Sequence, residues 1–191
     1  MLVTISNLGN PKQSNIGWVR RLYVLCAEAV KVYDPIRYPE RTFTAANTLT
    51  TGDIMPVDMP VLYGIQFPKR GCTMEQKQVE TEGGIVYDVT IQAELTTHAP
   101  DFFLFLRKNQ EKELVALAED QNGTCYLIGN EEHGLRAEAG GKIADINSSA
   151  FQLTGRFAYP VFYLSTLEPA VLFAELGFEP SHYTTTEYET I

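Results

Sequence analysis

The sequence predicts a mainly β fold (a β-rich α+β chain) with one short helix and long loops. Three patterns lead to this prediction. Apolar and polar residues alternate over Ile85–Leu95 and again over Phe151–Phe157, which is the period of a half-buried strand. An Asn-Gly pair at residues 122–123 separates two apolar runs, and this is a strong hairpin signal.

The composition is that of one soluble globular domain, with 45% hydrophobic and 20% charged residues in a chain of 191. We expect a single β-rich domain over residues 1–164 and a C-terminal extension over residues 165–191 that docks or frays. No apolar run reaches the roughly 18 residues of a membrane-spanning helix. The first residues also lack the pattern of a secretory signal.

Three cysteines, Cys26, Cys72 and Cys125, stand far apart without the paired spacing of a zinc site. We therefore expect reduced, mostly buried thiols and no metal or cofactor. The net charge of −9 argues against a surface that binds duplex nucleic acid through its phosphates. The same charge would keep a protein from adhering to nucleic acid that slides past it.

The first third of the chain is the hardest to interpret. Apolar residues within Val19–Tyr33 fit helical spacing, yet Trp18–Leu25 also suits a strand, so both alternatives stay open. The region Asp34–Pro60 contains four prolines and no convincing period. A structureless loop of this length is unusual inside a compact domain. We expect it to be disordered or to be ordered by something outside the domain.

A hairpin is predicted in the middle of the chain. The odd positions of Ile85–Leu95 are apolar and should face the core, whereas the even positions are mostly polar. Gly83-Gly84 before this run is a turn signal, and the extended stretch Thr73–Glu80 precedes it.

One short helix is predicted over Ala99–Gln110. A proline stands near its start, an aspartate in its first turn and two cations near its end, which are the preferences of helix termini. Phe102, Phe103 and Leu106 would form its buried stripe.

A second hairpin joins Leu114–Ala118 to Thr124–Ile128. Asp120, Asn122 and Gly123 form its structural turn, because Asn and Gly both tolerate a positive φ.

The last part of the predicted domain combines a loop and a strand. A Gly- and Ala-rich loop is expected over Glu131–Asn147. In the strand that follows, Phe151, Leu153 and Phe157 would face the core. Gly155 would mark a bulge or the close approach of another backbone.

Glu131-Glu132-His133 is the best candidate for catalytic chemistry. It could be a carboxylate–imidazole pair for general acid–base work. However, the sequence contains neither HExxH nor a nucleophile elbow, and His98 and His182 give no ligand spacing. We therefore assign no catalytic, cofactor-binding or metal-binding residue, and we expect the protein not to be an enzyme.

The order of these features resembles a known family. A Gly-Gly hairpin, a short aromatic helix, the D-x-N-G hairpin running into Tyr126–Asn130, the Gly/Ala-rich loop, Asp145-Ile146-Asn147 and the strand Phe151–Phe157 follow one another. This succession is similar to that of virion structural proteins of phages and prophages of gut Bacteroidetes type. It also resembles the broader tail tube family, with its tail-terminator and head–tail connector relatives. The resemblance covers roughly Gly17 to Leu164.

The resemblance implies a fold of two packed antiparallel sheets, a sandwich or partial barrel, with one short flanking helix. It also implies a structural subunit of a virion, assembled in the bacterial host cytoplasm without a membrane. Subunits of this family form rings, commonly six-fold, around a DNA channel, so the partners would be copies of the chain, other virion proteins and DNA that passes without specific binding. The family reaches neighbouring subunits with a long loop. By this analogy Trp18–Leu25 would be a strand, and the assembly loop would include Asp34, Tyr38, Arg41, Phe43, Asp53 and Met55.

Two other functions are compatible with the sequence. The first is a monomeric β-sandwich that binds a host or carbohydrate ligand through exposed tyrosines and Trp18. The second, more remote, is a hydrolase centred on Glu132 and His133. It requires the imidazole to lie within hydrogen-bonding distance of a nucleophile.

Overall fold

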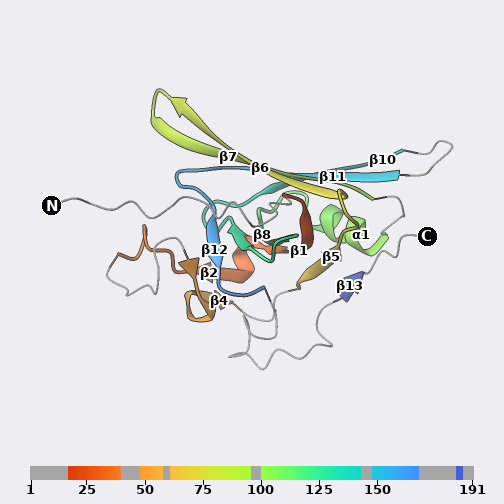
Figure 1. The fold of residues 1–191 in the computed structure, drawn as a ribbon, viewed down its shortest axis with the longest axis horizontal. Coiled ribbons are helices and arrows are strands. Elements are labelled where there is room, and N and C mark those ends of the chain that lie inside the picture. Colours follow the sequence, from red (N-terminus) through yellow and green to blue (C-terminus); the bar gives the residue numbers. More distant parts are fainter. Residues whose placement is uncertain are drawn as a thin grey trace.

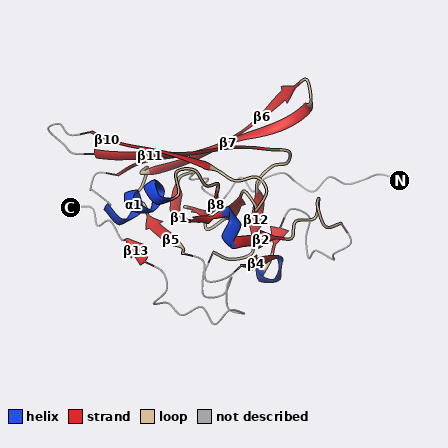
Figure 2. Cartoon of the chain, turned by 180° about the vertical axis from the view of Figure 1, so that it is seen from behind, coloured by secondary structure: helices blue, strands red, loops and turns tan. Residues whose placement is uncertain are grey.

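The computed structural model describes residues 17–39, 48–57, 61–95, 100–142, 148–167 and 184–186. Within them the chain is mainly β with one short α-helix, as predicted (Figures 1 and 2). The elements in chain order are β1 (Val19–Cys26), the 3₁₀ turn η1 (Ala27–Ala29), β2 (Val30–Val32), β3 (Thr48–Leu49), the 3₁₀ turn η2 (Thr51–Asp53), β4 (Ile54–Pro56), β5 (Tyr63–Gln66), β6 (Cys72–Thr81), β7 (Gly84–Leu95), α1 (Pro100–Lys108), β8 (Leu114–Asp120), β9 (Cys125–Ile128), β10 (Arg136–Lys142), β11 (Ser148–Phe157), β12 (Phe162–Leu164) and β13 (Thr184–Thr186).

The strands form a large sheet with a smaller sheet on each side. The central sheet has the order β13-β5-β1-β8-β9-β12-β3, the second has the order β10-β11-β7-β6, and β2 pairs with β4. Figure 1 shows the four-stranded sheet lying across the body of the molecule. The four-stranded sheet is antiparallel throughout. The central sheet is mixed, because β13 pairs with β5 and β12 pairs with β3 in the parallel direction.

The central sheet is buried on both faces. Leu114, Ala116 and Ala118 of β8 pack in the cluster that faces the four-stranded sheet, whereas Val115 and Leu117 pack in the cluster on the opposite face. A strand covered on both sides reads as a continuous apolar run without alternation.

The same burial resolves the ambiguity of the first third of the chain. Val19–Cys26 is a strand with β5 on one side and β8 on the other. It is followed by η1 and β2, so no helix occupies Val19–Tyr33 beyond that single 3₁₀ turn.

The strand β7 follows the predicted alternation over only part of its length. Val89, Ile91, Ala93 and Leu95 are all buried, but Ile85 on the same face is 53% exposed. The cause is the length of the neighbouring strand, because β11 ends opposite Tyr87. Beyond that point, among the described residues, 79–86 pair only with each other. This segment, the ribbon tip, projects past the body of the molecule (Figure 1).

The turns follow the sequence signals with two refinements. Thr81 pairs with Gly84, so Glu82-Gly83 is the loop of the first hairpin and Gly84 begins β7 with φ of 116°. In the second hairpin the Oδ1 atom of Asp120 accepts the N–H groups of Asn122 and Thr124 at 2.8 and 2.9 Å.

Only one residue of the Asn-Gly pair needs a positive φ. Gly123 has φ of 82°. Asn122 does not have a positive φ, because Arg70 is the sole non-glycine residue with one among those described. The N–H of Gly123 donates to the carbonyl of Asp120 at 3.1 Å, which is the arrangement of a type I turn followed by a glycine bulge.

The helix α1 buries a somewhat different stripe from the one predicted. Leu106 is buried as expected, and Phe105 is buried against the ring of Tyr63 at 4.4 Å between centroids. Leu104 is 49% exposed. The side chains of Phe102 and Phe103 lie outside the described part of the structure.

Two regions predicted to be loops contain strands. Within Asp34–Pro60, β4 pairs with β2 and β3 pairs with β12. Within Glu131–Asn147, β10 pairs along seven residues with β11. The sequence did not reveal these strands, because they are short or glycine-rich and are stabilised by pairing with other strands rather than by their own periodicity.

Gly155 is neither a bulge nor a contact between backbones. It pairs regularly with Val89, and a Cβ there would lie 2.7 Å from Cζ of Phe157, so the glycine leaves room for that ring.

Packing of the domain continues to Leu167, which is 2% exposed. In the predicted extension, β13 pairs with β5. The helices that the structure describes include none with the length and apolarity to cross a membrane.

Candidate functional site

The residues predicted for the assembly loop divide into three groups. Arg41 and Phe43 lie outside the described residues. Asp34 and Asp53 are buried, with 0% and 7% of their surfaces exposed, whereas Met55 is 44% exposed and Tyr38 is half-buried. The described parts of this region are thus attached to their own domain, and only some of the named residues offer a surface.

Asp53 has an identifiable role inside the domain. Its Oδ2 atom accepts the backbone N–H and the hydroxyl of Thr50 at 2.9 and 2.7 Å, which closes a capping box around η2. This local bonding fixes the strand β4 that follows.

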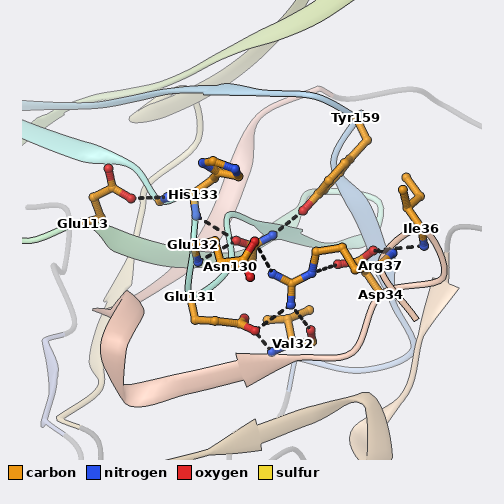
Figure 3. Close-up of polar contacts among 11 residues, drawn as sticks. Val32, Asp34, Ile36, Arg37, Glu113, Asn130, Glu131, Glu132, His133 and Tyr159 are labelled. Atoms are coloured by element: carbon orange, nitrogen blue, oxygen red, sulfur yellow. Dashed lines mark hydrogen bonds and ion pairs between the residues drawn. The ribbon is translucent and has the colours of Figure 1, made fainter. Parts of the chain in front are cut away.

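Asp34 organises a polar cluster with Arg37 at its centre (Figure 3). The Oδ1 atom of Asp34 accepts the backbone N–H groups of Ile36 and Arg37 at 3.0 and 2.8 Å. Its Oδ2 atom lies 2.9 Å from Nε of Arg37 as an ion pair. A single carboxylate therefore both forms the turn and orients the guanidinium.

The guanidinium of Arg37 joins two distant segments. Its Nη2 atom donates to the carbonyl of Val32 at 2.8 Å and to Oε1 of Glu131 at 2.6 Å, and Nη1 lies 3.4 Å from Oε2 of Glu132. Oε2 of Glu131 also accepts the N–H of Val32 at 3.0 Å. The start of the long loop is thereby tied to the segment that follows β9.

The charges of the cluster shift two pKa values. Burial opposes the charged guanidinium of Arg37, but the hydrogen bond that it donates to Glu131 and the nearby carboxylates outweigh burial and raise its pKa above the usual value. Burial and then the charge of Asp34 raise the pKa of Tyr159 to about 12. Both groups therefore keep their neutral-pH protonation states over a wide pH range.

His133 does not join the two glutamates in an acid–base pair. Its imidazole is exposed, and its contacts are made by the backbone: its N–H donates to Oδ1 of Asn130 at 2.8 Å, and its carbonyl accepts the N–H of Asn130. The amide nitrogen of Asn130 donates to the hydroxyl of Tyr159.

Gly134 is required by close packing rather than by chemistry. A Cβ at this position would lie 2.6 Å from Cβ of Glu113 and 2.9 Å from the carbonyl oxygen of Leu114. The Glu-Glu-His-Gly stretch is thus a tight structural loop whose carboxylates neutralise Arg37. Sequence reasoning selected the glutamates but missed Arg37, since nothing local to Arg37 indicates partners about 94 residues away.

The four-stranded sheet provides a second candidate site. Among the described residues, β6 and β10 form its two edges, and neither has a hydrogen-bonded neighbour on its outer side. Among the side chains that the structure describes, alternation places four acidic and three basic ones on the face away from the core, where Arg156 and Asp88 form an exposed ion pair at 2.6 Å. These side chains are Glu75, Lys77, Asp88, Glu94, Arg136, Glu138 and Arg156.

The remaining candidate chemistry is limited. All three cysteines are free, with Cys72 and Cys125 buried, which confirms the prediction of mostly buried thiols. The described residues include no group of three or more side chains arranged to hold a metal ion. Trp18 is half-buried, and its carbonyl accepts the N–H of Gln121.

Comparisons with protein-family models, with curated proteins and with solved structures give no match to this chain. The function is therefore argued from the geometry and from the order of motifs in the sequence.

Proposed function

We propose that the chain is a structural subunit of a phage or prophage tail or head–tail connector, which self-assembles into a ring or tube through the edges of its four-stranded sheet. The observation that carries the proposal is the pair of edge strands β6 and β10, which have no strand neighbour on their outer sides among the described residues. Exposed edges offer rows of unpaired N–H and C=O groups, which pair readily with another chain.

The directions of the two edges favour a repeating contact. Each neighbouring pair in the order β10-β11-β7-β6 is antiparallel, so β10 and β6 run in opposite directions. If β6 of one copy lies beside β10 of the next, the antiparallel alternation continues from subunit to subunit. A contact between two different edges is head-to-tail, and head-to-tail contacts generate rings or tubes.

The two edges are also staggered along the sheet. Strand β10 lies level with the half of β7 that packs on the core, whereas β6 runs on to the ribbon tip. Such a stagger is what a sheet needs in order to close into a barrel. Other virion proteins would be the further partners, and DNA would pass without specific binding.

The first test is the size of the purified protein, measured by light scattering over a range of concentrations and by electron microscopy. Rings with a central channel, or oligomers that grow with concentration, support the proposal. A strict monomer at high concentration contradicts it.

A pair of proline variants tests the edge itself. In an edge strand, successive residues direct their N–H groups alternately into the sheet and away from it. One of the two variants Glu138→Pro and Ala139→Pro therefore removes an N–H that points away from the sheet, and this variant should keep the fold. Far-UV circular dichroism identifies which variant is folded. We expect this folded variant to assemble at least tenfold more weakly. Unchanged assembly would contradict pairing through β10.

A further inference from the structure

We propose that the ribbon tip of one copy docks into a groove beside α1 of the next copy. The inference rests on the proposed self-assembly, but it names a different contact from the strand edges. The ribbon tip and α1, which lines the groove, lie toward opposite sides of the molecule in Figures 1 and 2. A contact between them is therefore head-to-tail.

The groove is lined by described residues of four segments and has a volume of about 440 Å³. Its apolar surface includes Tyr63 and Phe105, and three of its side chains remain unusually exposed: Val57, Val61 and Leu104, at 47%, 61% and 49%. Clustered exposed apolar side chains around a hollow mark an interaction site.

The charge of the groove is basic. Lys112 is paired with Glu28 at 2.9 Å, which leaves that pair neutral. Lys108 also lines the groove, is exposed, and forms no ion pair with any residue that the structure describes. The groove thus offers an apolar surface with one available cation at its rim.

The ribbon tip has the complementary character. On the face that continues the interior face of β7, Ile85 is 53% exposed and lies directly opposite Glu80 of β6. Glu82 in the turn adds a second exposed carboxylate. Side chains that face each other across two strands are about 5 Å apart, so an apolar anchor and an acidic group enter a partner together.

The described part of the chain gives the tip no third strand. Residues 79–86 pair only as a two-stranded ribbon, because β11 stops at Phe157 opposite Tyr87. Isolated two-stranded ribbons are marginally stable in water. Insertion of Ile85 into the groove, with Glu80 beside Lys108, would bury the exposed apolar side chains of both surfaces.

A charge exchange tests the contact on the full-length protein, with light scattering and sedimentation as the readouts. We expect Lys108→Glu and Glu80→Lys each to weaken assembly about tenfold, because like charges then meet across the contact. We expect the chain that carries both substitutions to recover assembly. An equimolar mixture of the two single variants should assemble better than either alone, since each tip then meets an oppositely charged groove.

The controls separate this contact from the strand edges. Lys69→Glu makes the same charge change in the exposed turn before β6 and should leave assembly unchanged. Ile85→Ser should weaken assembly, whereas Val86→Ser on the other face of the ribbon should not. If the charge variants assemble as the Lys69 control does, tip docking is overturned while edge pairing can stand. If the native chain is strictly monomeric, both proposals are overturned.

Discussion

The two halves of β7 differ in their surroundings although they share one alternating pattern. In the half Val89–Leu95, the apolar face lies in the core between two sheets, but over Gly84–Val86 the same face extends past β11, and no described residue covers it. Alternation reports which side chains share a face. It does not report where the layer that covers this face ends.

Alanine substitution of two isoleucines on one face of β7 provides the sharpest test of this comparison. Ile91 is fully buried, so Ile91→Ala should lower the free energy of unfolding by about 3 kcal/mol through lost burial and the cavity it leaves. Ile85→Ala, with 53% of its side chain already exposed, should change the free energy by no more than about 0.5 kcal/mol. Urea denaturation at a concentration where the chain is monomeric measures both. Equal losses would mean that the tip is covered within its own subunit.

The ion pairs of the interior and of the outer face offer a second comparison. Arg37 is tied to Asp34 and Glu131, and its side chain is 15% exposed. Arg37→Met leaves the buried carboxylate of Asp34 without its cation, so we expect a loss of about 2 kcal/mol, below the 3 to 5 kcal/mol of fully buried pairs because Arg37 retains some solvent contact.

Arg156→Met is the matched control for this prediction. Arg156 pairs with Asp88 on the exposed face of the four-stranded sheet, and exposed pairs contribute little to stability. We expect thermal unfolding of this variant to follow that of the native chain. If the two arginine variants unfold at the same temperature, the Arg37 cluster does not hold the start of the long loop.

Sequence patterns predict the structure wherever the information is local. The alternation of Phe151–Phe157 and the turn at Asp120–Gly123 depend on neighbouring residues, and both are confirmed. The pairing of β6 with β7 also follows from a local signal, the glycine pair between them.

Two of the failures arise where distant segments supply the partner, since β3 is stabilised by β12 and Arg37 by Glu131. Strand β10 pairs with the next strand, β11, and its glycines and alanines give no alternation that predicts it. None of these pairings has a signature in its own stretch of chain. For the same reason the sequence selected the two glutamates as candidate chemistry, although their role is to neutralise an arginine that the pattern does not reveal.

Alanine substitutions at two glycines compare a correctly predicted turn with a strand that the sequence predicts to be a loop. Gly123 has φ of 82°, a conformation that costs other residues roughly 1 to 2 kcal/mol, so Gly123→Ala should destabilise the chain by about 1 kcal/mol. Gly140 lies in β10 with no atom within 4 Å of an added Cβ. Gly140→Ala should be neutral or slightly stabilising, because alanine restricts the unfolded chain. Differential scanning calorimetry distinguishes the two variants, and destabilisation at Gly140 would contradict its place in an open edge strand.

Substitutions at two tyrosines beside the central sheet should give the smallest effect. They test whether burial of the two hydroxyl groups favours their neutral form. Burial raises the pKa of Tyr126 and of Tyr159 to about 12, and the charges of Asp120 and Asp34, respectively, are the next largest causes. A free tyrosine has a pKa of about 10. The folded state therefore retains these protons more tightly than the unfolded state, and the stabilisation is complete below pH of about 10 and is lost as the pH rises toward about 12.

We expect the urea midpoint of the native chain to fall across this interval, with less loss in Tyr126→Phe and in Tyr159→Phe. Tyr159→Phe should also be slightly less stable at neutral pH, because the amide of Asn130 loses its acceptor. Tyrosinate absorbance, followed in the same samples, separates ionisation in the folded chain from unfolding. If both variants lose stability in parallel with the native chain, then neither hydroxyl is held in its neutral form by the fold.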